Sequence, residues 1–257
     1  MAFRKIEPEK LADSVIGQIE ELILQGILRP GERLPSEREL SERLGVSRPS
    51  LREAIAALQD KGLLTTKAGS GVYVAEVLGS AFSPALVALF KRHERAVDDY
   101  IAFRRDLEGL AAERAARLAS DTDLAVVSTI FEKMQAAHQK RNPNDEAQLD
   151  AQFHLAIIEA SHNVIMLHMM RSMFDLLSEG VFYNRQMMFR QRATRDMLLT
   201  QHGAINQALL QRAPEAARDA VEAHMDYVRQ CLSDQRRAAA DEEVALQRLE
   251  YEQSRGA

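Results

Sequence analysis

The chain has 257 residues, 46% of them hydrophobic, and its net charge of −5 argues against a protein that coats nucleic acid through bulk positive charge. This length allows two globular domains. One cysteine excludes an internal disulfide, and the sequence shows neither an apolar run of about 20 residues nor an N-terminal signal, so we expect a cytoplasmic protein that contacts no membrane.

The first two predicted helices have clear ends. Apolar residues recur at helical spacing over residues 10–25, and Gly26 ends this helix. Ser36 and Glu39 form a Ser-x-x-Glu capping box that opens the second helix, and Gly45 ends it. A tight turn containing glycine therefore follows the second helix.

The third predicted helix has two different sides. Ser47 caps it, and its first turn tolerates Pro49 because the early amides of a helix have no intrahelical partner. One side carries Leu51, Ile55 and Leu58, and the other side carries Arg48, Ser50 and Arg52. Two short helices joined in this way are typical of a helix-turn-helix whose second helix enters the major groove, where arginine can pair with guanine or phosphate.

A predicted hairpin follows the third helix. Residues 63–66 and 72–74 are expected to form strands, joined by the glycine-rich residues 67–71, which could approach DNA beside the recognition helix. The helix pair and hairpin together predict a winged helix-turn-helix. We expect its DNA contacts at Arg33, Arg38, Ser47, Arg48, Ser50, Arg52, Lys67 and Gly69. Because one recognition helix reads only a few base pairs, we expect a homodimer on a pseudo-palindromic operator of double-stranded DNA.

Only helical patterns follow the hairpin. They cover residues 84–93, 97–119, 122–140, 146–161, 164–183, 194–212 and 214–235. We therefore expect a mainly α protein: a winged helix-turn-helix domain over 1–76, a linker over 77–84, an all-α helical bundle over 85–235 and a charged C-terminal tail over 236–257.

Several polar residues of the expected bundle have apolar neighbours. Asp150 and His154 stand four residues apart on one helix face, and His202 and His224 belong to two later helices. Together they could bind a transition metal in the bundle core, although a lone inward histidine is more often a hydrogen-bonded core residue. Arg104 and Glu108, also four apart, could form an ordinary ion pair on a helix surface.

Two main classes of function are compatible with these residues. A metabolite-responsive transcription regulator would use the buried ligands to sense a small molecule, whereas a metal-dependent hydrolase would use them to activate water. The linked DNA-binding head and the lack of a separate general base or nucleophile favour the regulator. A constitutive architectural DNA-binding protein would have no use for buried polar ligands.

Two stretches carry a family resemblance. Residues 28–64, LRPGERLPSERELSERLGVSRPSLREAIAALQDKGLL, resemble the winged helix-turn-helix of the GntR family of bacterial transcription regulators. Residues 149–163, LDAQFHLAIIEASHN, with the later histidines, resemble the FCD effector-binding domain of the FadR-like branch. This resemblance implies that a divalent metal, zinc in the first place and nickel or manganese as alternatives, is held by Asp150, His154, His202 and His224.

The resemblance also implies the kind of effector. The family pattern of Arg, two residues and Leu-Glu matches Arg104, which would bind the effector carboxylate. Within the branch, the chain is most similar to regulators of pyruvate, lactate and glycolate metabolism. The resemblance therefore implies a repressor, not an enzyme, controlled by a small 2-hydroxy or 2-oxo monocarboxylate. The complete ligand set departs from the pyruvate-responsive repressors, which leaves lactate, glycolate or another small hydroxy acid open.

Overall fold

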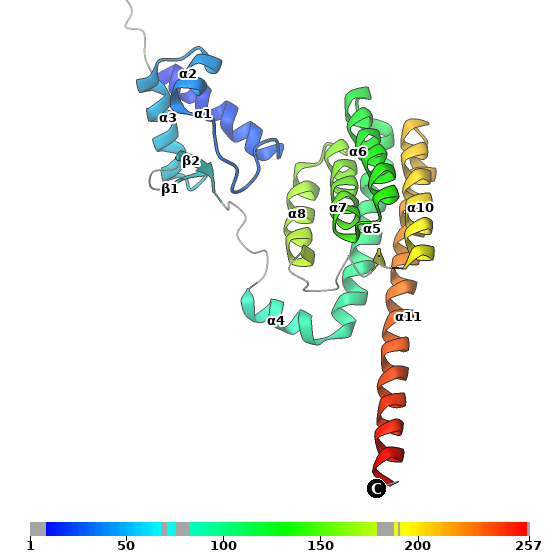
Figure 1. Cartoon of the computed structure of the whole chain (residues 1–257). Helices are drawn as coiled ribbons and strands as arrows, with labels where there is room; N and C mark the ends of the chain where they lie inside the picture. The colour runs from blue at the N-terminus through cyan, green and yellow to red at the C-terminus, as the bar shows by residue number, and fades with distance from the viewer. Residues whose placement is uncertain (1–8, 68–70, 76–82, 179–187, 190, 256–257) are drawn as a thin grey trace, which may run out of the picture. The chain divides into compact units, whose positions relative to one another are not determined.

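The chain forms two compact units, Met1–Ala81 and Phe82–Ala257 (Figure 1). The computed structural model describes residues 9–67, 71–75, 83–178, 188–189 and 191–255. Most of the expected linker lies outside these ranges, so the domain boundaries drawn from the sequence stay a prediction. None of the described helices combines the length and the apolar character that crossing a lipid bilayer requires.

The first unit begins with a three-helix arrangement. Its helices are α1 (Glu9–Leu24), α2 (Glu37–Leu44) and α3 (Arg48–Asp60). The capping box contributes one expected bond, because the hydroxyl of Ser36 accepts from the amide of Glu39 at 3.3 Å. Gly45 ends α2 in the left-handed conformation, with φ of 65°, which glycine adopts at little cost. The turn between α2 and α3 is therefore encoded locally.

A two-stranded wing follows α3. Strand β1 (Leu64–Lys67) pairs antiparallel with β2 (Gly71–Val74). Strand β1 is shifted by one residue at both ends from the expected strand and β2 begins one residue earlier, because the ladder extends to the Lys67 and Gly71 pair. Arg33 adds a single bridge to Tyr73 of β2. The core of this unit joins α1, α3 and the wing through Val15, Ile19, Leu51, Leu58, Leu64 and Val74.

The second unit is helical throughout its described residues. Its helices are α4 (Pro84–Arg92), α5 (Glu94–Leu118), α6 (Asp121–Lys140), α7 (Pro143–Ala160), α8 (Val164–Ser178), α10 (Arg192–Leu210) and α11 (Pro214–Arg255). The sequence placed the start of α7 at residue 146, which is wrong. The side chain of Asn142 caps the helix by accepting from the amide of Asn144 at 3.0 Å, and Pro143 is tolerated in the first turn.

Helix α7 lies within the bundle and packs against α5, α6 and α8 (Figure 1). Its buried face contains Phe153 and Ile157, together with the polar Asp150 and His154. Among the described helices, α5 and α11 have the most extensive contact with each other. A Cβ atom on Gly109 of α5 would lie 3.1 Å from the Cγ atom of a glutamate of α11, so this glycine permits the close approach.

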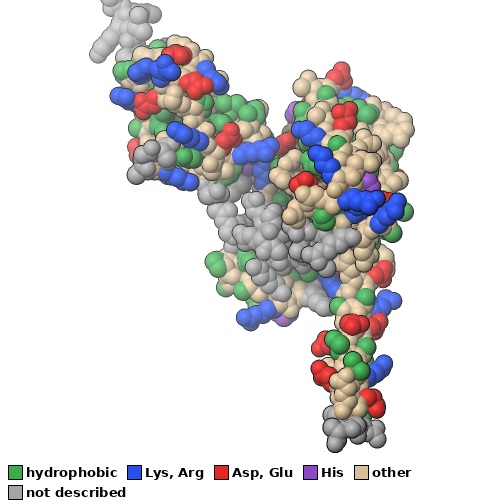
Figure 2. All heavy atoms as spheres, viewed as in Figure 1, with side chains coloured by type: hydrophobic (Ala, Val, Ile, Leu, Met, Phe, Trp, Pro, Cys, Tyr) green, Lys and Arg blue, Asp and Glu red, His purple; other side chains and the backbone are tan. Residues whose placement is uncertain are grey.

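Helix α11 continues past the end expected from the sequence. Its last buried side chain is Leu232, and the side chains over 237–253 are exposed. The part of α11 that projects from the bundle carries hydrophobic, acidic and basic side chains (Figure 2). The expected tail 236–257 is therefore helical as far as Arg255. The reason is local, because no glycine or proline occurs after Pro214 in this helix and alanine, glutamate, leucine and arginine favour it.

Candidate metal centre and DNA-binding head

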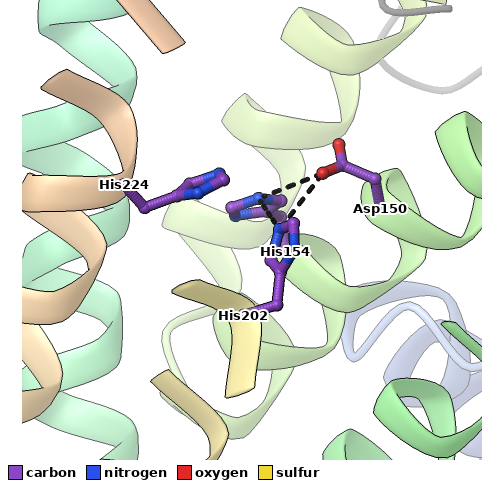
Figure 3. Close-up of side chains that lie close together, drawn as sticks. All are labelled: Asp150, His154, His202 and His224. Carbon is purple, nitrogen blue, oxygen red and sulfur yellow. Dashed lines mark hydrogen bonds and ion pairs between the residues drawn. The ribbon is translucent and has the colours of Figure 1, made fainter. Parts of the chain in front are cut away.

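Four buried side chains from three helices converge inside the second unit (Figure 3). They are Asp150 and His154 of α7, His202 of α10 and His224 of α11. Each offers one ligand atom, and these atoms lie within 4.8 Å of one another. The fold thus brings together the residues that the sequence analysis named as metal ligands.

The carboxylate of Asp150 faces two of the imidazole rings. Its Oδ1 atom lies 3.2 Å from Nε2 of His202 and 3.8 Å from Nε2 of His154. The two Nε2 atoms are 3.3 Å apart. These residues are at most 6% exposed, and polar groups so buried need a partner that offsets their lost hydration. Imidazole nitrogens and a carboxylate oxygen are a ligand set that fits a divalent transition metal.

Two imidazoles are oriented through their second nitrogen. Nδ1 of His154 lies 2.6 Å from Oε2 of Glu108, and Nδ1 of His224 lies 3.0 Å from Oε1 of Gln201. The contact of His224 is a hydrogen bond, and that of His154 is a close ion-pair contact. A proton on Nδ1 beside either oxygen leaves Nε2 as the bare nitrogen, as is usual for metal-binding histidines. Gln201 was not predicted from the sequence, and Glu108 was predicted only as a partner of Arg104.

Burial and charge set the protonation of this region. Burial, followed by the neighbouring rings of His202 and His154, lowers the pKa of His224 well below its usual 6.5. Burial raises the pKa of Glu108, but Arg104 and His154 outweigh it and lower that pKa to about 2. His224 is therefore neutral at pH 7, the form that binds metals, and Glu108 is ionised.

Arg104 lies inside the bundle, 2% exposed. Its Nε atom is 2.5 Å from Oε1 of Glu108, and its guanidinium carbon lies 5.1 Å from the ring centre of Phe174. A surface ion pair of Arg104 and Glu108 is therefore excluded, because both side chains are buried. Arg104 lines one small cavity with Asp150, His154, Met188, Phe189, Leu198, His224 and Val228.

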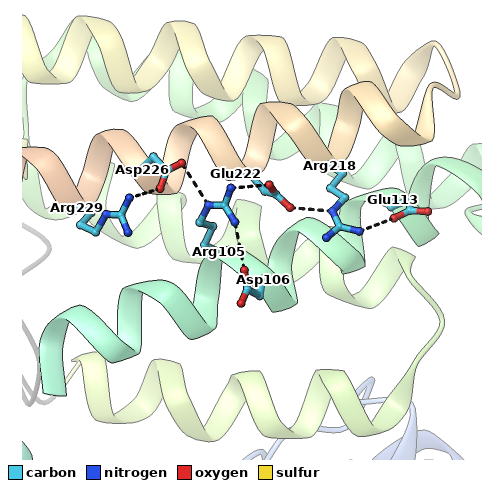
Figure 4. Close-up of polar contacts among 7 residues, drawn as sticks. All are labelled: Arg105, Asp106, Glu113, Arg218, Glu222, Asp226 and Arg229. Atoms are coloured by element: carbon cyan, nitrogen blue, oxygen red, sulfur yellow. Dashed lines mark hydrogen bonds and ion pairs between the residues drawn. The ribbon is translucent and has the colours of Figure 1, made fainter. Parts of the chain in front are cut away.

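A network of ion pairs fastens α11 to α5 near His224 (Figure 4). The guanidinium of Arg105 lies 2.7 Å from Glu222 and 3.2 Å from Asp226, which precede and follow His224 by two residues. Glu222 also contacts Arg218, at 2.8 Å. The two adjacent arginines thus have different surroundings. The side chain of Arg104 is buried inside the bundle, whereas Arg105 forms ion pairs with α11, the helix that carries His224.

In the first unit, the residues expected at DNA lie on the surface. Ser47 is exposed, Ser50 is half-buried, and Gly69 lies outside the described residues. The five expected basic residues are all exposed: Arg33, Arg38, Arg48, Arg52 and Lys67. Ser47 caps α3, because its hydroxyl accepts from the amide of Ser50 at 3.3 Å. The two serine hydroxyls are 2.9 Å apart, so both lie at the N-terminal end of α3.

The basic residues near α3 have acidic and aromatic neighbours. Nε of Arg52 lies 2.8 Å from Oε2 of Glu37, which joins the N-terminal turns of α2 and α3. Lys67 lies over the ring of Tyr73, 4.7 Å from its centre. Arg33 and Arg52 line one surface hollow bounded by α2, α3 and the wing. An exposed pair such as Arg52 and Glu37 is weak, so a phosphate or base edge can replace the carboxylate.

Comparison with protein-family models assigns both units. The model for bacterial regulatory proteins of the gntR family matches residues 11–74, and the FCD domain model matches residues 99–227. A solved structure, Streptococcus agalactiae GntR, is similar over 87% of this chain and 100% of its own, with a TM-score of 0.55 and 26% sequence identity.

Curated relatives are similar over most of the chain. The Glc operon transcriptional activator of Escherichia coli strain K12 is 35% identical over 90% of this chain and 92% of its own. A protein of the same strain, named as a regulatory protein of the L-lactate dehydrogenase operon, is 34% identical over 86% of each chain. The HTH-type transcriptional regulator LutR of Bacillus subtilis strain 168 is 30% identical over 82% of this chain and 96% of its own. These names describe transcription regulators, not enzymes, so the hydrolase alternative is set aside.

Proposed function

The chain belongs to the gntR family of bacterial regulatory proteins, with an FCD domain in its C-terminal half, and from this premise we propose that it is a repressor controlled by a small 2-hydroxy or 2-oxo monocarboxylate. The observation that carries the proposal is the position of Arg104, whose buried side chain lines the same small pocket as Asp150, His154 and His224. A cation and a candidate metal site in one cavity suit an acid that has a second oxygen beside its carboxylate.

We propose that Asp150, His154, His202 and His224 hold one divalent metal, with zinc favoured by the nitrogen-rich ligand set and nickel or manganese as alternatives. When bound, the ion supplies positive charge and coordination positions for oxygen atoms of the acid. The protein residues supply the ligands, and Arg104 supplies donors that can pair with a carboxylate.

The buried charges favour a monocarboxylate. Among the described residues at this cavity and its immediate partners, Arg104 is positive, whereas Glu108 and Asp150 are negative. Their sum is one negative charge, and a divalent ion changes it to one positive charge. A monocarboxylate then makes the buried site neutral, whereas a dicarboxylate leaves it negative, and unpaired buried charge is costly. We therefore expect the acid to bind only after the metal.

Lactate, glycolate and pyruvate are the acids to test first. One relative is named for the L-lactate dehydrogenase operon, and each of these acids has one carboxylate and an adjacent oxygen. We propose that the acid favours a dimer arrangement that binds the operator less well, so that it relieves repression. By linkage, the operator must then weaken acid binding by the same factor. This assignment places the protein with the chromosome, in the cytoplasm.

We propose that the first unit binds operator DNA through Arg33, Arg38, Ser47, Arg48, Ser50, Arg52, Lys67 and Gly69, with two copies of the chain on two half-sites. The exposure of Arg48 and Arg52 at the first turns of α3 supports this assignment, because the N-terminal residues of a recognition helix are those that reach base edges.

A titration of the operator complex tests the function. Operator duplexes would be recovered by in vitro selection with the zinc-loaded protein, and their affinity measured by fluorescence anisotropy with L-lactate, glycolate, pyruvate or malonate as a dicarboxylate control. We expect one monocarboxylate to weaken binding by about 5–150-fold and malonate to have little effect. If no monocarboxylate changes operator affinity or raises the melting temperature of the zinc-loaded protein, the proposed effector class is wrong.

A further inference from the structure

Glu108 lies between the arginine of the cavity and a ligand of the candidate metal centre. Its Oε1 atom is 2.5 Å from Nε of Arg104, and its Oε2 atom is 2.6 Å from Nδ1 of His154. Arg104 and Glu108 are each 2% exposed, and His154 is 1% exposed. One carboxylate therefore contacts both groups where water has little access.

The position of Glu108 selects the tautomer of His154. A carboxylate oxygen repels the lone pair of a bare ring nitrogen and attracts an N–H group, so the contact of 2.6 Å favours the proton on Nδ1. When the ring is neutral, Nε2 is then the bare nitrogen, and this is the atom that lies near His202 and Asp150. The opposite tautomer would direct a lone pair at the carboxylate and a proton at the metal position.

We propose that Glu108 is a positioning residue of the metal centre, which holds His154 in the Nδ1-protonated tautomer and presents its Nε2 atom to the ion, while Arg104 holds Glu108 in place. The inference rests on the proposed metal site. It adds a role for a residue of α5, a helix that contributes none of the four ligand candidates. The residue expected to bind the acid and a ligand of the metal thus share one carboxylate.

Substitution of Glu108 by glutamine removes the negative charge and keeps the size and shape of the side chain. The amide has one oxygen, which can accept from Arg104 or from His154, and an NH₂ group that must face the other partner. When the oxygen accepts from Arg104, the NH₂ group faces Nδ1 of His154 and favours the tautomer with the proton on Nε2. Glu108→Gln should therefore disturb the tautomer of His154 while it preserves the volume of the side chain.

The chain offers a matched control in Glu146. This carboxylate is also buried, at 5% exposure, and pairs with an arginine, Arg195, at 2.6 Å. It lies on α7 one turn before Asp150, and it pairs with Arg195 and His138, neither of which is a ligand candidate. Glu146→Gln thus removes a comparable buried charge near the site while it leaves the tautomer of His154 unchanged.

The test measures tautomer and metal binding in the full-length protein. Long-range ¹H–¹⁵N spectra of the metal-free protein, labelled with ¹⁵N-histidine and assigned with a His154→Gln sample, report which nitrogen is protonated. We expect the Nδ1–H form in the wild type and in Glu146→Gln, and an increased Nε2–H population in Glu108→Gln. Zinc affinity, from competition with a chelator, should fall by about 10–100-fold in Glu108→Gln only.

Two outcomes would overturn the role of Glu108: an unchanged tautomer in Glu108→Gln, or zinc affinities that are equal in the two glutamine variants. If Glu108→Gln does not fold because Arg104 is left unpaired, the double variant Arg104→Met, Glu108→Met removes both charges and leaves no oxygen that could accept from Nδ1 of His154, and it undergoes the same measurements. A wild type that binds no zinc would refute the proposed metal site, whereas the tautomer in the metal-free protein would still test Glu108.

Discussion

Arg195 of α10 and Glu146 of α7 form a buried ion pair one helical turn before the position of Asp150: Nε of Arg195 lies 3.0 Å and 2.9 Å from the two carboxylate oxygens of Glu146. The Nη2 atom of Arg195 also donates to the backbone carbonyl of His138 at 2.8 Å. This pair joins α6, α7 and α10 through buried contacts.

We predict that Glu146→Ala destabilises the second unit strongly. The change leaves the charge of Arg195 buried without its carboxylate, which costs about 3–5 kcal/mol. Urea unfolding of the full-length protein, followed by circular dichroism, measures the loss. Glu159→Ala is the comparison, because the pair of Glu159 with Arg171 is more exposed. Equal losses in the two variants would show that burial of the Arg195 pair does not determine its contribution.

We predict that the metal binds through the histidines of α10 and α11. The double variant His202→Ala, His224→Ala should lose zinc in elemental analysis of the purified protein. Zinc at about 100 times its dissociation constant should stabilise the wild type by about 2.7 kcal/mol, and it should not stabilise the variant. His162→Ala serves as the control, because its side chain is 54% exposed and pairs with Asp123. Equal zinc content in wild type and double variant refutes the site.

We predict that the first turns of α3 carry much of the operator affinity. Arg48→Ala or Arg52→Ala should weaken operator binding by about 1–3 kcal/mol if the arginine makes a bidentate base contact. Fluorescence anisotropy at fixed salt concentration measures the change. Lys61→Ala is the matched control, since Lys61 lies at the opposite end of α3 and pairs with Glu20 at 2.8 Å. An operator affinity unchanged in both arginine variants would exclude the assigned contacts.

We predict a pH-dependent contribution from the cap of α6. Burial alone would raise the pKa of Asp123, but hydrogen bonds from the hydroxyl and amide of Ser120 lower it below the ordinary 3.8. Because the folded pKa is the lower one, the stabilisation is fully present above 3.8 and is lost as the pH falls through the folded value. Asp123→Asn should therefore cost about 1 kcal/mol at pH 7.

Urea unfolding of the wild type and Asp123→Asn, at pH 7 and at several values below 4, checks this prediction. The difference between the two proteins should shrink as the pH falls. Asp121→Asn provides the control in the same turn, because Asp121 does not take part in the capping box and its side chain is fully exposed. A difference that grows on acidification would give the opposite sign and contradict the shift of Asp123.

The sequence by itself determined features that depend on near neighbours. The cap at Ser36 and the left-handed Gly45 require only a few adjacent residues, and so does the common face of Asp150 and His154. The winged helix-turn-helix and the helical bundle followed from such signals together with the family resemblance. The start of α7 was placed wrongly because Asn142 and Pro143 fit a turn as well as a helix start, and only the cap hydrogen bond distinguishes them.

Only the tertiary structure decided how distant residues meet. His202 lies 48 residues from His154 in sequence, and Nδ1 of His154 faces Glu108 of another helix. These contacts depend on how far each helix is rotated and translated against its neighbours, which side-chain packing throughout the bundle fixes. The same packing buries Arg104 while it leaves the adjacent Arg105 half-buried against α11. The sequence could therefore identify which residues are able to bind a metal, whereas the packing of α5, α7, α10 and α11 determined which side chains each of them contacts.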